Sequence, residues 1–265
     1  MVDPEPTKGL PPESSAGSAP VRGTFLRRTG QRLRASVVAH PIRWGLGTLL
    51  GLLVLQLAVL PYGEVLAYRR TNPKETAFMR EQEEAAREKG RRFRKMQYWI
   101  PLREIPRDAV NAVIVAEDGT FWTHGGFDWY EFRESVERNL EEGRAARGAS
   151  TITQQLVKNL FLSASKNPLR KLKEWALTWF TERVMSKSRI LELYLNVIEW
   201  GDGVYGIEAA SRYYFDESAS QLTREQAARL AAIIPSPRRH RADVDSRYVV
   251  RRSRLVLERL AARGW

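Results

Sequence analysis

The feature that most constrains this chain is a run of 20 residues without a charge, from Trp44 to Gly63 (WGLGTLLGLLVLQLAVLPYG). About 20 apolar residues in a helix, each rising about 1.5 Å, cross a hydrocarbon core about 30 Å thick. A buried helix of a soluble protein is the alternative, but Thr48 and Gln56 are too few to give this run a polar face. Trp44 and Tyr62 occupy the two ends, which suits aromatic residues at a membrane interface. The run predicts one transmembrane helix over residues 44–63.

The charges before this run predict its orientation. Residues 1–43 form a polar, proline-rich tail with seven Lys or Arg and three acidic residues, and six of the seven bases lie in 22–43. Because basic flanks stay on the cytoplasmic side, we expect a cytoplasmic N-terminus and an external chain after Gly63. A cleaved signal peptide is the competing interpretation. The basic segment before the run is longer than is usual in a signal peptide, and the run ends in LPYGEV without a small-residue cleavage pattern. We therefore interpret the run as an uncleaved signal anchor.

Composition narrows the chemistry of the external part. The 265 residues include no cysteine and three histidines, which excludes disulfide frameworks, thiolate metal sites and cysteine nucleophiles. The net charge of +12 fits nucleic acid, an anionic membrane or a phosphorylated substrate. External placement argues against nucleic acid.

The remainder divides into a charged segment and a helical domain. Residues 64–95 are predicted as a charged, helical juxtamembrane stalk, and residues 96–265 as a mainly α domain. An apolar stripe at helical spacing comprises Leu169, Leu172, Trp175, Ala176 and Trp179. Besides the helix that carries this stripe, four helices are predicted, two of them opened by T-x-x-Q capping boxes at Thr151 and Thr223: 106–117, 151 onward, 188–196 and 224–234.

Glu117 is the residue whose position most suggests catalysis. It shares the apolar face of the predicted helix 106–117 with Val113 and Ile114. A carboxylate there loses hydration, which raises its pKa toward the range useful to a general base. The alternative is a helix-end glutamate that turns to solvent. Next to it, Asp118 could cap or coordinate, and His124 could bind substrate or be a hydrogen-bonded structural residue.

Hydrogen-bond donors gather in the segment GASTITQQLVKNLFL, residues 148–162. Thr151, Gln155 and Asn159 recur every four residues on one helix face, with Lys158 beside them. Free N–H groups at the start of this helix, with the hydroxyl of Ser150, suit phosphate oxygens. A solvated polar face is the alternative.

A third cluster is RKLKE at residues 170–174. An ordinary surface ion pair between Arg170 and Glu174, one turn apart, is the simpler interpretation. The functional alternative is that Arg170 and Lys171 clamp a pyrophosphate, while Glu174 supplies a second carboxylate or a metal ligand.

In combination, these segments resemble the peptidoglycan glycosyltransferase family in its single-domain, membrane-anchored form, the monofunctional biosynthetic peptidoglycan transglycosylases. The resemblance covers about residues 96–240, and Ser211 replaces an alanine expected in the last motif. Five motifs occur in family order: E-D-x-x-F-x-x-H-x-G-x-D at 117–128, G-[GA]-S-T-I-T-Q-Q followed by K-N at 148–159, R-K-x-x-E at 170–174, I-L-x-x-Y-L-N at 190–196, and GDGVYGIEAASRYYF at 201–215.

The resemblance implies a mainly α, lysozyme-like glycosyltransferase domain with a small membrane-facing lobe. The aromatic residues Phe127, Trp129, Tyr130 and Phe132 are candidates for that lobe, although an ordinary core cluster explains them equally well. The implied reaction polymerises lipid II into β-1,4-linked glycan with release of undecaprenyl pyrophosphate. No transpeptidase part is expected. The implied location is the cell inner (plasma) membrane, with the domain periplasmic and cell-wall synthesis or division proteins as partners.

The resemblance also implies roles for individual residues. Glu117 would be the general base that deprotonates the acceptor hydroxyl. Glu174 would stabilise the leaving pyrophosphate directly or through Mg²⁺ or Mn²⁺, assisted by the cations of Lys158, Arg170 and Lys171. The other residues expected to bind substrate are Asp118, Phe121, His124, Ser150, Thr151, Gln155 and Asn159.

Two other functions compete with this one. A membrane-bound lysozyme-like hydrolase or lytic transglycosylase would also use a glutamate in an α-helical lobe. The donor-rich helix and the R-K-x-x-E motif favour a substrate with a pyrophosphate over bare glycan. A basic membrane scaffold that recruits cell-wall proteins is the non-enzymatic alternative, and it would not need Glu117.

Overall fold

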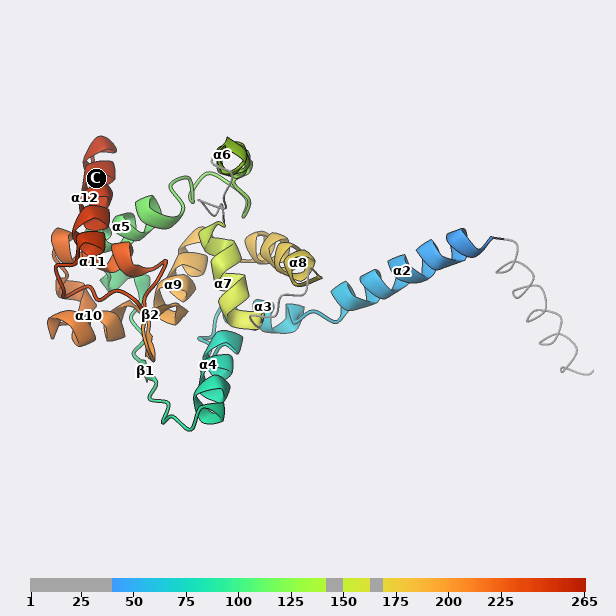
Figure 1. Ribbon diagram of the computed structural model, residues 1–265, viewed down its shortest axis with the longest axis horizontal. Coiled ribbons are helices and arrows are strands. Elements are labelled where there is room, and N and C mark those ends of the chain that lie inside the picture. Colours follow the sequence, from blue (N-terminus) through green and yellow to red (C-terminus); the bar gives the residue numbers. More distant parts are fainter. Residues whose placement is uncertain (1–39, 142–149, 163–168) are drawn as a thin grey trace, which may run out of the picture. The chain divides into compact units, whose positions relative to one another are not determined.

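The computed structural model describes residues 40–141, 150–162 and 169–265, so the tail over residues 1–39 and the motif residues Gly148 and Ala149 lie outside the described residues. The described part is mostly helical, as predicted (Figure 1). Its helices are α2 (Pro41–Ala58), α3 (Tyr62–Tyr68), α4 (Ala77–Glu88), α5 (Arg107–Glu117), α6 (Trp129–Glu141), α7 (Ile152–Phe161), α8 (Leu169–Val184), α9 (Lys187–Val197), α10 (Ile207–Phe215), α11 (Arg224–Ile233) and α12 (Arg247–Ala262). Short 3₁₀ turns are η1 (Leu102–Glu104) and η2 (Ala219–Gln221), and the strands are β1 (Met96–Gln97), β2 (Glu199–Gly201) and β3 (Val204–Tyr205).

The predicted transmembrane helix corresponds to α2, which has no buried residue. Within the described ranges, the helical stretch 41–68 alone is long and apolar enough to cross a membrane, judged by length and composition. The helix ends earlier than the predicted residue 63, because Pro61 has no N–H and disfavours helical backbone at the residue before it. A new helix, α3, begins at Tyr62.

The second compact unit comprises Val59–Trp265 and therefore includes the whole segment predicted as a stalk. Val65 on α3 and Met79 on α4 are fully buried members of the hydrophobic core. The helix α4 packs against α7, and α3 packs against α8. The folded unit thus begins well before the expected boundary at residue 96, because the apolar residues between the charges of 64–95 are spaced for burial.

The core of this unit forms around α7 and α9, with a second group of helices comprising α5, α11 and α12. The helix α7 packs against α8 and α9, while α11 packs against both α5 and α12. The predicted helices over 106–117, 188–196 and 224–234 are confirmed with small shifts at their ends. Both capping boxes form as predicted, at Thr151 and at Thr223.

The apolar stripe predicted on residues 169–179 lies on the exposed face of α8. Trp175 and Trp179 are 36% and 52% exposed, whereas Glu174, Leu177 and Thr178 are buried. The helix therefore directs a carboxylate inward and tryptophans outward. This arrangement leaves the apolar stripe uncovered within the described unit.

A small three-stranded sheet holds the segment that precedes α5 through its strand β1. Its strand order is β1–β3–β2, with β1 parallel and β2 antiparallel to β3. Gly203 has a φ of +77°, and a Cβ atom there would lie 2.2 Å from the carbonyl oxygen of Arg94, so the turn requires glycine. Asn196, from the fourth motif, is buried and exchanges two hydrogen bonds of 2.9 Å with the backbone of Ile100.

Candidate active site

Glu117 is the last residue of α5 and lines a cleft of about 790 Å³. One wall of the cleft comes from α7 and the residues before it, and another comes from α12. The side chain is half-buried. Loss of hydration raises the pKa of Glu117, and the hydrogen bond from Gln155 and the charges of Arg252 and Lys158 oppose this rise only in part. The structure therefore gives the desolvated carboxylate that the helical spacing predicted.

Gln155 fixes the orientation of this carboxylate. Its Nε2 donates to Oε2 of Glu117 at 2.9 Å, and its Oε1 accepts from the hydroxyl of Tyr194 at 2.9 Å. Burial, and secondarily the charge of Glu117, raise the pKa of Tyr194 well above its usual value, so its hydroxyl stays protonated and can donate. Because the tyrosine hydroxyl occupies the amide oxygen, the amide nitrogen must face Glu117.

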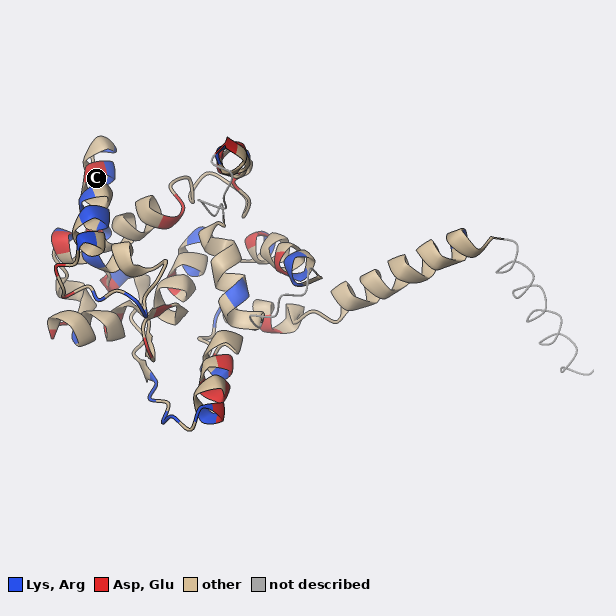
Figure 2. Ribbon diagram, viewed as in Figure 1, with Lys and Arg blue, Asp and Glu red and all other residues tan. Residues whose placement is uncertain are grey.

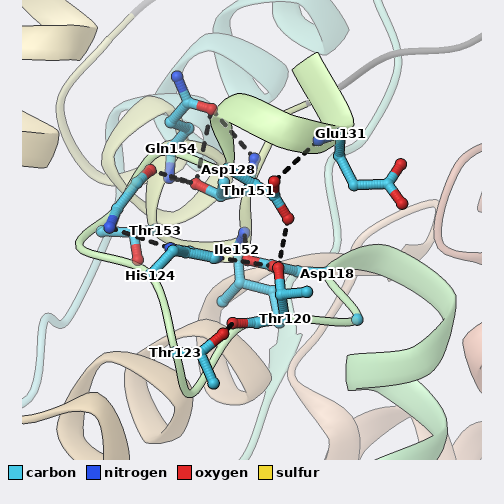
Figure 3. Close-up of polar contacts among 12 residues, drawn as sticks. Asp118, Thr120, Thr123, His124, Asp128, Glu131, Thr151, Ile152, Thr153 and Gln154 are labelled. Carbon is cyan, nitrogen blue, oxygen red and sulfur yellow. Dashed lines mark hydrogen bonds and ion pairs between the residues drawn. The ribbon is translucent and has the colours of Figure 1, made fainter. Parts of the chain in front are cut away.

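Asp118 faces away from Glu117 and links two parts of the site. Its Oδ1 accepts from Nε2 of His124 at 2.8 Å, and its Oδ2 accepts from the backbone N–H of Ile152 at 2.9 Å, in the first turn of α7 (Figure 3). The other ring nitrogen of His124 accepts from the N–H of Gly126 at 3.0 Å. Both oxygens of the aspartate and both nitrogens of the histidine are thus used within the protein.

The loop after α5 is joined to the start of α7 by a second set of contacts. The hydroxyl of Thr151 donates to the carbonyl of Gly126 at 2.8 Å and accepts from the N–H of Gln154 at 3.2 Å (Figure 3). Asp128 accepts from the hydroxyl of Thr120 and caps α6 through the N–H of Glu131 at 2.8 Å. The first two motifs therefore form one hydrogen-bonded unit beneath the cleft.

Cations from the second and third motifs gather near Lys158. This lysine lines the cleft, and partial loss of hydration lowers its pKa, opposed chiefly by the charge of Glu174 and also by that of Glu117. Charge repulsion from Arg170 and Lys171 lowers the pKa of Lys158 further, so the three cations act on one another. Their mutual repulsion makes this cluster a favourable place for a multiply charged anion.

Glu174 is buried on α8 and pairs with the ammonium of Lys171. The simple interpretation of the third motif, an ion pair between Arg170 and Glu174, is replaced by this pair one residue closer in sequence. Among the residues that the structure describes, no group of three or more His, Cys, Asp or Glu side chains could hold a metal ion. A divalent cation at Glu174 would have one protein carboxylate, already shared with an ammonium group.

The structure brings together about half of the residues predicted to act on the substrate. Those lining the cleft are Glu117, Asp118, Ser150, Thr151, Gln155 and Lys158. Phe121 is fully buried beneath the site, with the ammonium of Lys187 4.4 Å from its ring centroid, and His124 lies behind Asp118. Asn159 donates back to the carbonyl of Gln155 at 2.8 Å. These last three residues support the site and do not line the cleft.

A smaller hollow of about 200 Å³ adjoins the cleft, since Asp128 and Ser150 line both. Its walls are aromatic: Phe127 stacks on Trp129 with ring centroids 5.5 Å apart, and Trp129 meets Trp175 edge to face at 6.4 Å. Trp129 is 62% exposed, and Tyr130 and Phe132 beside it on α6 are also exposed. The core explanation of these aromatic residues is therefore wrong.

Sequence reasoning missed two contributors to the site. Tyr194 belongs to the fourth motif, and its place on one helix face with Ile190 and Leu191 could have marked its hydroxyl as a buried hydrogen-bond donor. The arginines of α12 and its C-cap that line the cleft, Arg252, Arg259 and Arg263, lie outside the five motifs. Nothing local in the sequence of α12 distinguishes them from the other arginines of that helix.

Comparison with known proteins identifies relatives over most of the chain. The family described as Transglycosylase matches residues 81–261, from within α4 to the end of α12. A biosynthetic peptidoglycan transglycosylase of Nitrosospira multiformis is 46% identical over 201 residues, which cover 76% of this chain and 87% of the relative. Proteins of the same name from Methylobacillus flagellatus and Dechloromonas aromatica are each 44% identical, covering 79% and 83% of this chain and 93% and 96% of the relatives.

Proposed function

This chain belongs to the transglycosylase family and is a peptidoglycan glycosyltransferase, and from that premise we propose that it polymerises lipid II into β-1,4-linked glycan strands and releases undecaprenyl pyrophosphate. The observation that carries the proposal is that a desolvated carboxylate, Glu117, and Lys158 line one cleft, with the charges of Arg170 and Lys171 acting on Lys158 from beside it. A base and an anion site side by side are what transfer from a sugar pyrophosphate requires.

In the proposed reaction, Glu117 takes the proton of the acceptor's 4-hydroxyl. The oxygen attacks the anomeric carbon of the donor, the new glycosidic bond forms with inversion, and the bond from that carbon to the pyrophosphate breaks. A carboxylate with a raised pKa is a better base than an ordinary one, because it gains more from accepting the proton. Gln155 holds it in place without competing for the proton, since the amide can only donate to it.

The leaving pyrophosphate takes the bonding electrons and needs its charge neutralised. Lys158, Arg170 and Lys171 provide three cations for this purpose. Glu174 contributes indirectly, by pairing with Lys171 and by favouring the charged form of Lys158. Mg²⁺ or Mn²⁺ would bind at Glu174 only with oxygens of the pyrophosphate as further ligands, and there it would supply additional positive charge.

The exposed aromatic surface supports the proposal of a membrane-facing lobe. The surface comprises Trp129, Tyr130 and Phe132 on α6 with Leu172, Trp175 and Trp179 on α8. Contiguous exposed apolar patches mark interaction sites, and tryptophan and tyrosine favour the membrane interface. A lipid-linked substrate would approach from such a surface. We place the domain on the periplasmic side of the inner membrane, with α2 as its anchor.

The decisive experiment offers the full-length protein in detergent two substrates separately. With lipid II we expect chain growth, and with preformed peptidoglycan we expect no loss of glycan. Glu117→Gln should nearly abolish growth, whereas the matched change Glu137→Gln at an exposed position of α6 should leave it unchanged. Cleavage of preformed glycan without chain growth would assign the protein to the hydrolases and lytic transglycosylases instead.

A further inference from the structure

A second cationic wall of the cleft is unexplained by the leaving group. Arg252 and Arg259 on α12, and Arg263 directly after its last residue, line the cleft together with Glu117. The helix α12 packs against α5 and α11, whereas α7, which carries Lys158, packs against α4, α8 and α9. The two sets of cations thus come from separate walls. Figure 2 shows the concentration of basic residues along α12.

Two of these arginines fasten α12 to the residues around Glu117. Arg259 donates from Nη1 to the carbonyl of Val115 at 3.1 Å, and Arg263 donates from Nη1 to the carbonyl of Gly119 at 2.5 Å. Each guanidinium carries five N–H groups, so one bond to a carbonyl leaves further donors for the cleft. These two residues therefore have a structural role and retain the capacity to bind an anion.

Arg252 is the arginine without such a role. It is half-buried. Among the described residues its guanidinium makes one cation–π contact, with the ring of Tyr248 at 5.7 Å from the centroid. No hydrogen bond or ion pair joins it to an acidic side chain in the described ranges. Arginine is rarely withdrawn from water unless an anion pairs with it. Its charge nevertheless reaches Glu117, whose pKa it lowers.

The proposed reaction supplies the missing anion. It joins two lipid II molecules, and each carries a pyrophosphate and the carboxylates of a stem peptide. The donor's pyrophosphate occupies the cations around Lys158. The acceptor must place its hydroxyl at Glu117, so the rest of the acceptor lies against the other wall of the cleft, which α12 forms.

We propose that Arg252, with Arg259 and Arg263 beside it, binds an anionic group of the acceptor, either a peptide carboxylate or a phosphate. This inference rests on the proposed function and deepens it, because it assigns the α12 wall to acceptor recognition. A planar guanidinium suits both anions, which it can hold through two parallel hydrogen bonds. Arg252 acts in binding and has no part in proton transfer.

The test separates the acceptor from the donor. The full-length protein receives a saturating lipid II analogue whose terminal sugar lacks the 4-hydroxyl, so that it can only donate, and labelled lipid II as acceptor at varied concentration. The capped single-transfer product is measured at a pH where Glu117 is ionised in every variant. Arg252→Gln should raise the acceptor KM about tenfold, the effect of losing one hydrogen bond between charged groups, with kcat and the donor KM within about twofold of wild type.

Two further variants complete the comparison. Arg252→Lys keeps the positive charge but lacks the planar set of N–H donors that can form two parallel hydrogen bonds. It should raise the acceptor KM by about threefold. Arg254→Gln, at an exposed arginine of α12 that does not line the cleft, should leave all constants unchanged. If Arg252→Gln fails to fold by circular dichroism, the Arg252→Lys value decides the matter, and an unchanged acceptor KM overturns the proposal.

The bound anion is identified with two altered acceptors, one with amidated stem carboxylates and one lacking the pyrophosphate and lipid. The group that Arg252 binds is the one whose removal makes wild type and Arg252→Gln equal in acceptor KM. An acceptor KM that Arg252→Gln does not change, with only the pH profile displaced, overturns the proposal. Absence of chain growth by wild type would instead refute the proposed function itself, so the two failures are distinguishable.

Discussion

The amide of Gln155 donates to the carboxylate of Glu117 at 2.9 Å, and it can do so in one orientation only. The hydroxyl of Tyr194, buried beneath it, occupies the amide oxygen at 2.9 Å. The base of the proposed reaction is therefore positioned by a chain of two hydrogen bonds that begins in the core. Removing either bond should change how the carboxylate titrates.

Gln155→Leu should move the acidic limb of the pH profile of kcat/KM to higher pH. The hydrogen bond from Gln155 lowers the pKa of Glu117, so its loss leaves the effect of burial less opposed and the pKa rises. Glu117 acts as the ionised base, so activity falls as the pH drops through that pKa. Initial rates of lipid II polymerisation across the acidic range measure the shift.

Tyr194→Phe should displace the limb in the same direction but by less, because the amide remains and only its orientation is released. Thr223→Ala, at the capping box of α11, provides a comparison that alters a capping hydrogen bond elsewhere in the unit. An unchanged limb in Gln155→Leu would show that this residue does not control the proton affinity of the base.

Glu117→Gln should lower the polymerisation rate by about 10²- to 10⁴-fold, the usual contribution of a general base. It should also raise the melting temperature at neutral pH. Burial raises the pKa of Glu117 in the folded state above its ordinary value of 4.5, so the folded protein binds more protons than the unfolded chain as the pH rises from 4.5 through that raised pKa.

The ionised glutamate therefore costs stability above this pH window, and a neutral glutamine removes the cost. The gain in melting temperature should shrink as the pH falls toward 4.5, where the glutamate is itself protonated. Thermal unfolding followed by circular dichroism from acidic to neutral pH checks both statements. A variant less stable than wild type at neutral pH would mean that the folded state does not disfavour the ionised form of Glu117.

The sequence predicted the helices and Glu117 for reasons that are local. A period of 3.6 residues placed Glu117 on an apolar face, and T-x-x-Q fixed the starts of α7 and α11, because both signals depend on residues within two turns of each other. The same local reasoning predicted the helix α8 but left the direction of its apolar stripe open. Periodicity identifies which residues share a face, but it does not say whether that face points to the core, and here Trp175 and Trp179 point outward.

What the sequence could not reveal are contacts between distant segments. Gln155 and Tyr194 are separated by 39 residues, and Arg259 and Val115 by 144. Such pairings follow from the packing of α7 on α9 and of α12 on α5, which no local pattern encodes. The extent of the folded unit was missed for a related reason, since Met79 is buried only through the packing of α4 on α7.

Glu174→Gln should move the alkaline limb of the pH profile to lower pH and lower the rate at least about tenfold. Partial loss of hydration already lowers the pKa of Lys158, and the charge of Glu174 is the main effect that opposes this. Without that charge Lys158 loses its proton at lower pH and can no longer neutralise the pyrophosphate. The exposed Glu137→Gln serves as the matched control.

The same profiles, recorded with a chelator and with added Mg²⁺ or Mn²⁺, separate two roles of Glu174. We expect the displacement of the alkaline limb in every condition, because it arises from one side chain acting on another. A defect confined to the samples containing metal would assign Glu174 to metal binding. Normal kinetics at all metal concentrations would remove Glu174 from the site.

Asp118→Asn should destabilise the fold by about 2 kcal/mol, although it removes no side-chain volume. The carboxylate of Asp118 accepts from His124 and from the backbone N–H of Ile152, so one of these donors must face the new amide nitrogen and lose its acceptor. Asp108→Asn, on the same helix but paired with Arg224 at 3.6 Å in a solvent-exposed position, should cost no more than about 0.5 kcal/mol. Urea unfolding of both variants measures the difference. Equal stability of the two would mean that the bond to α7 does not hold the first two motifs together.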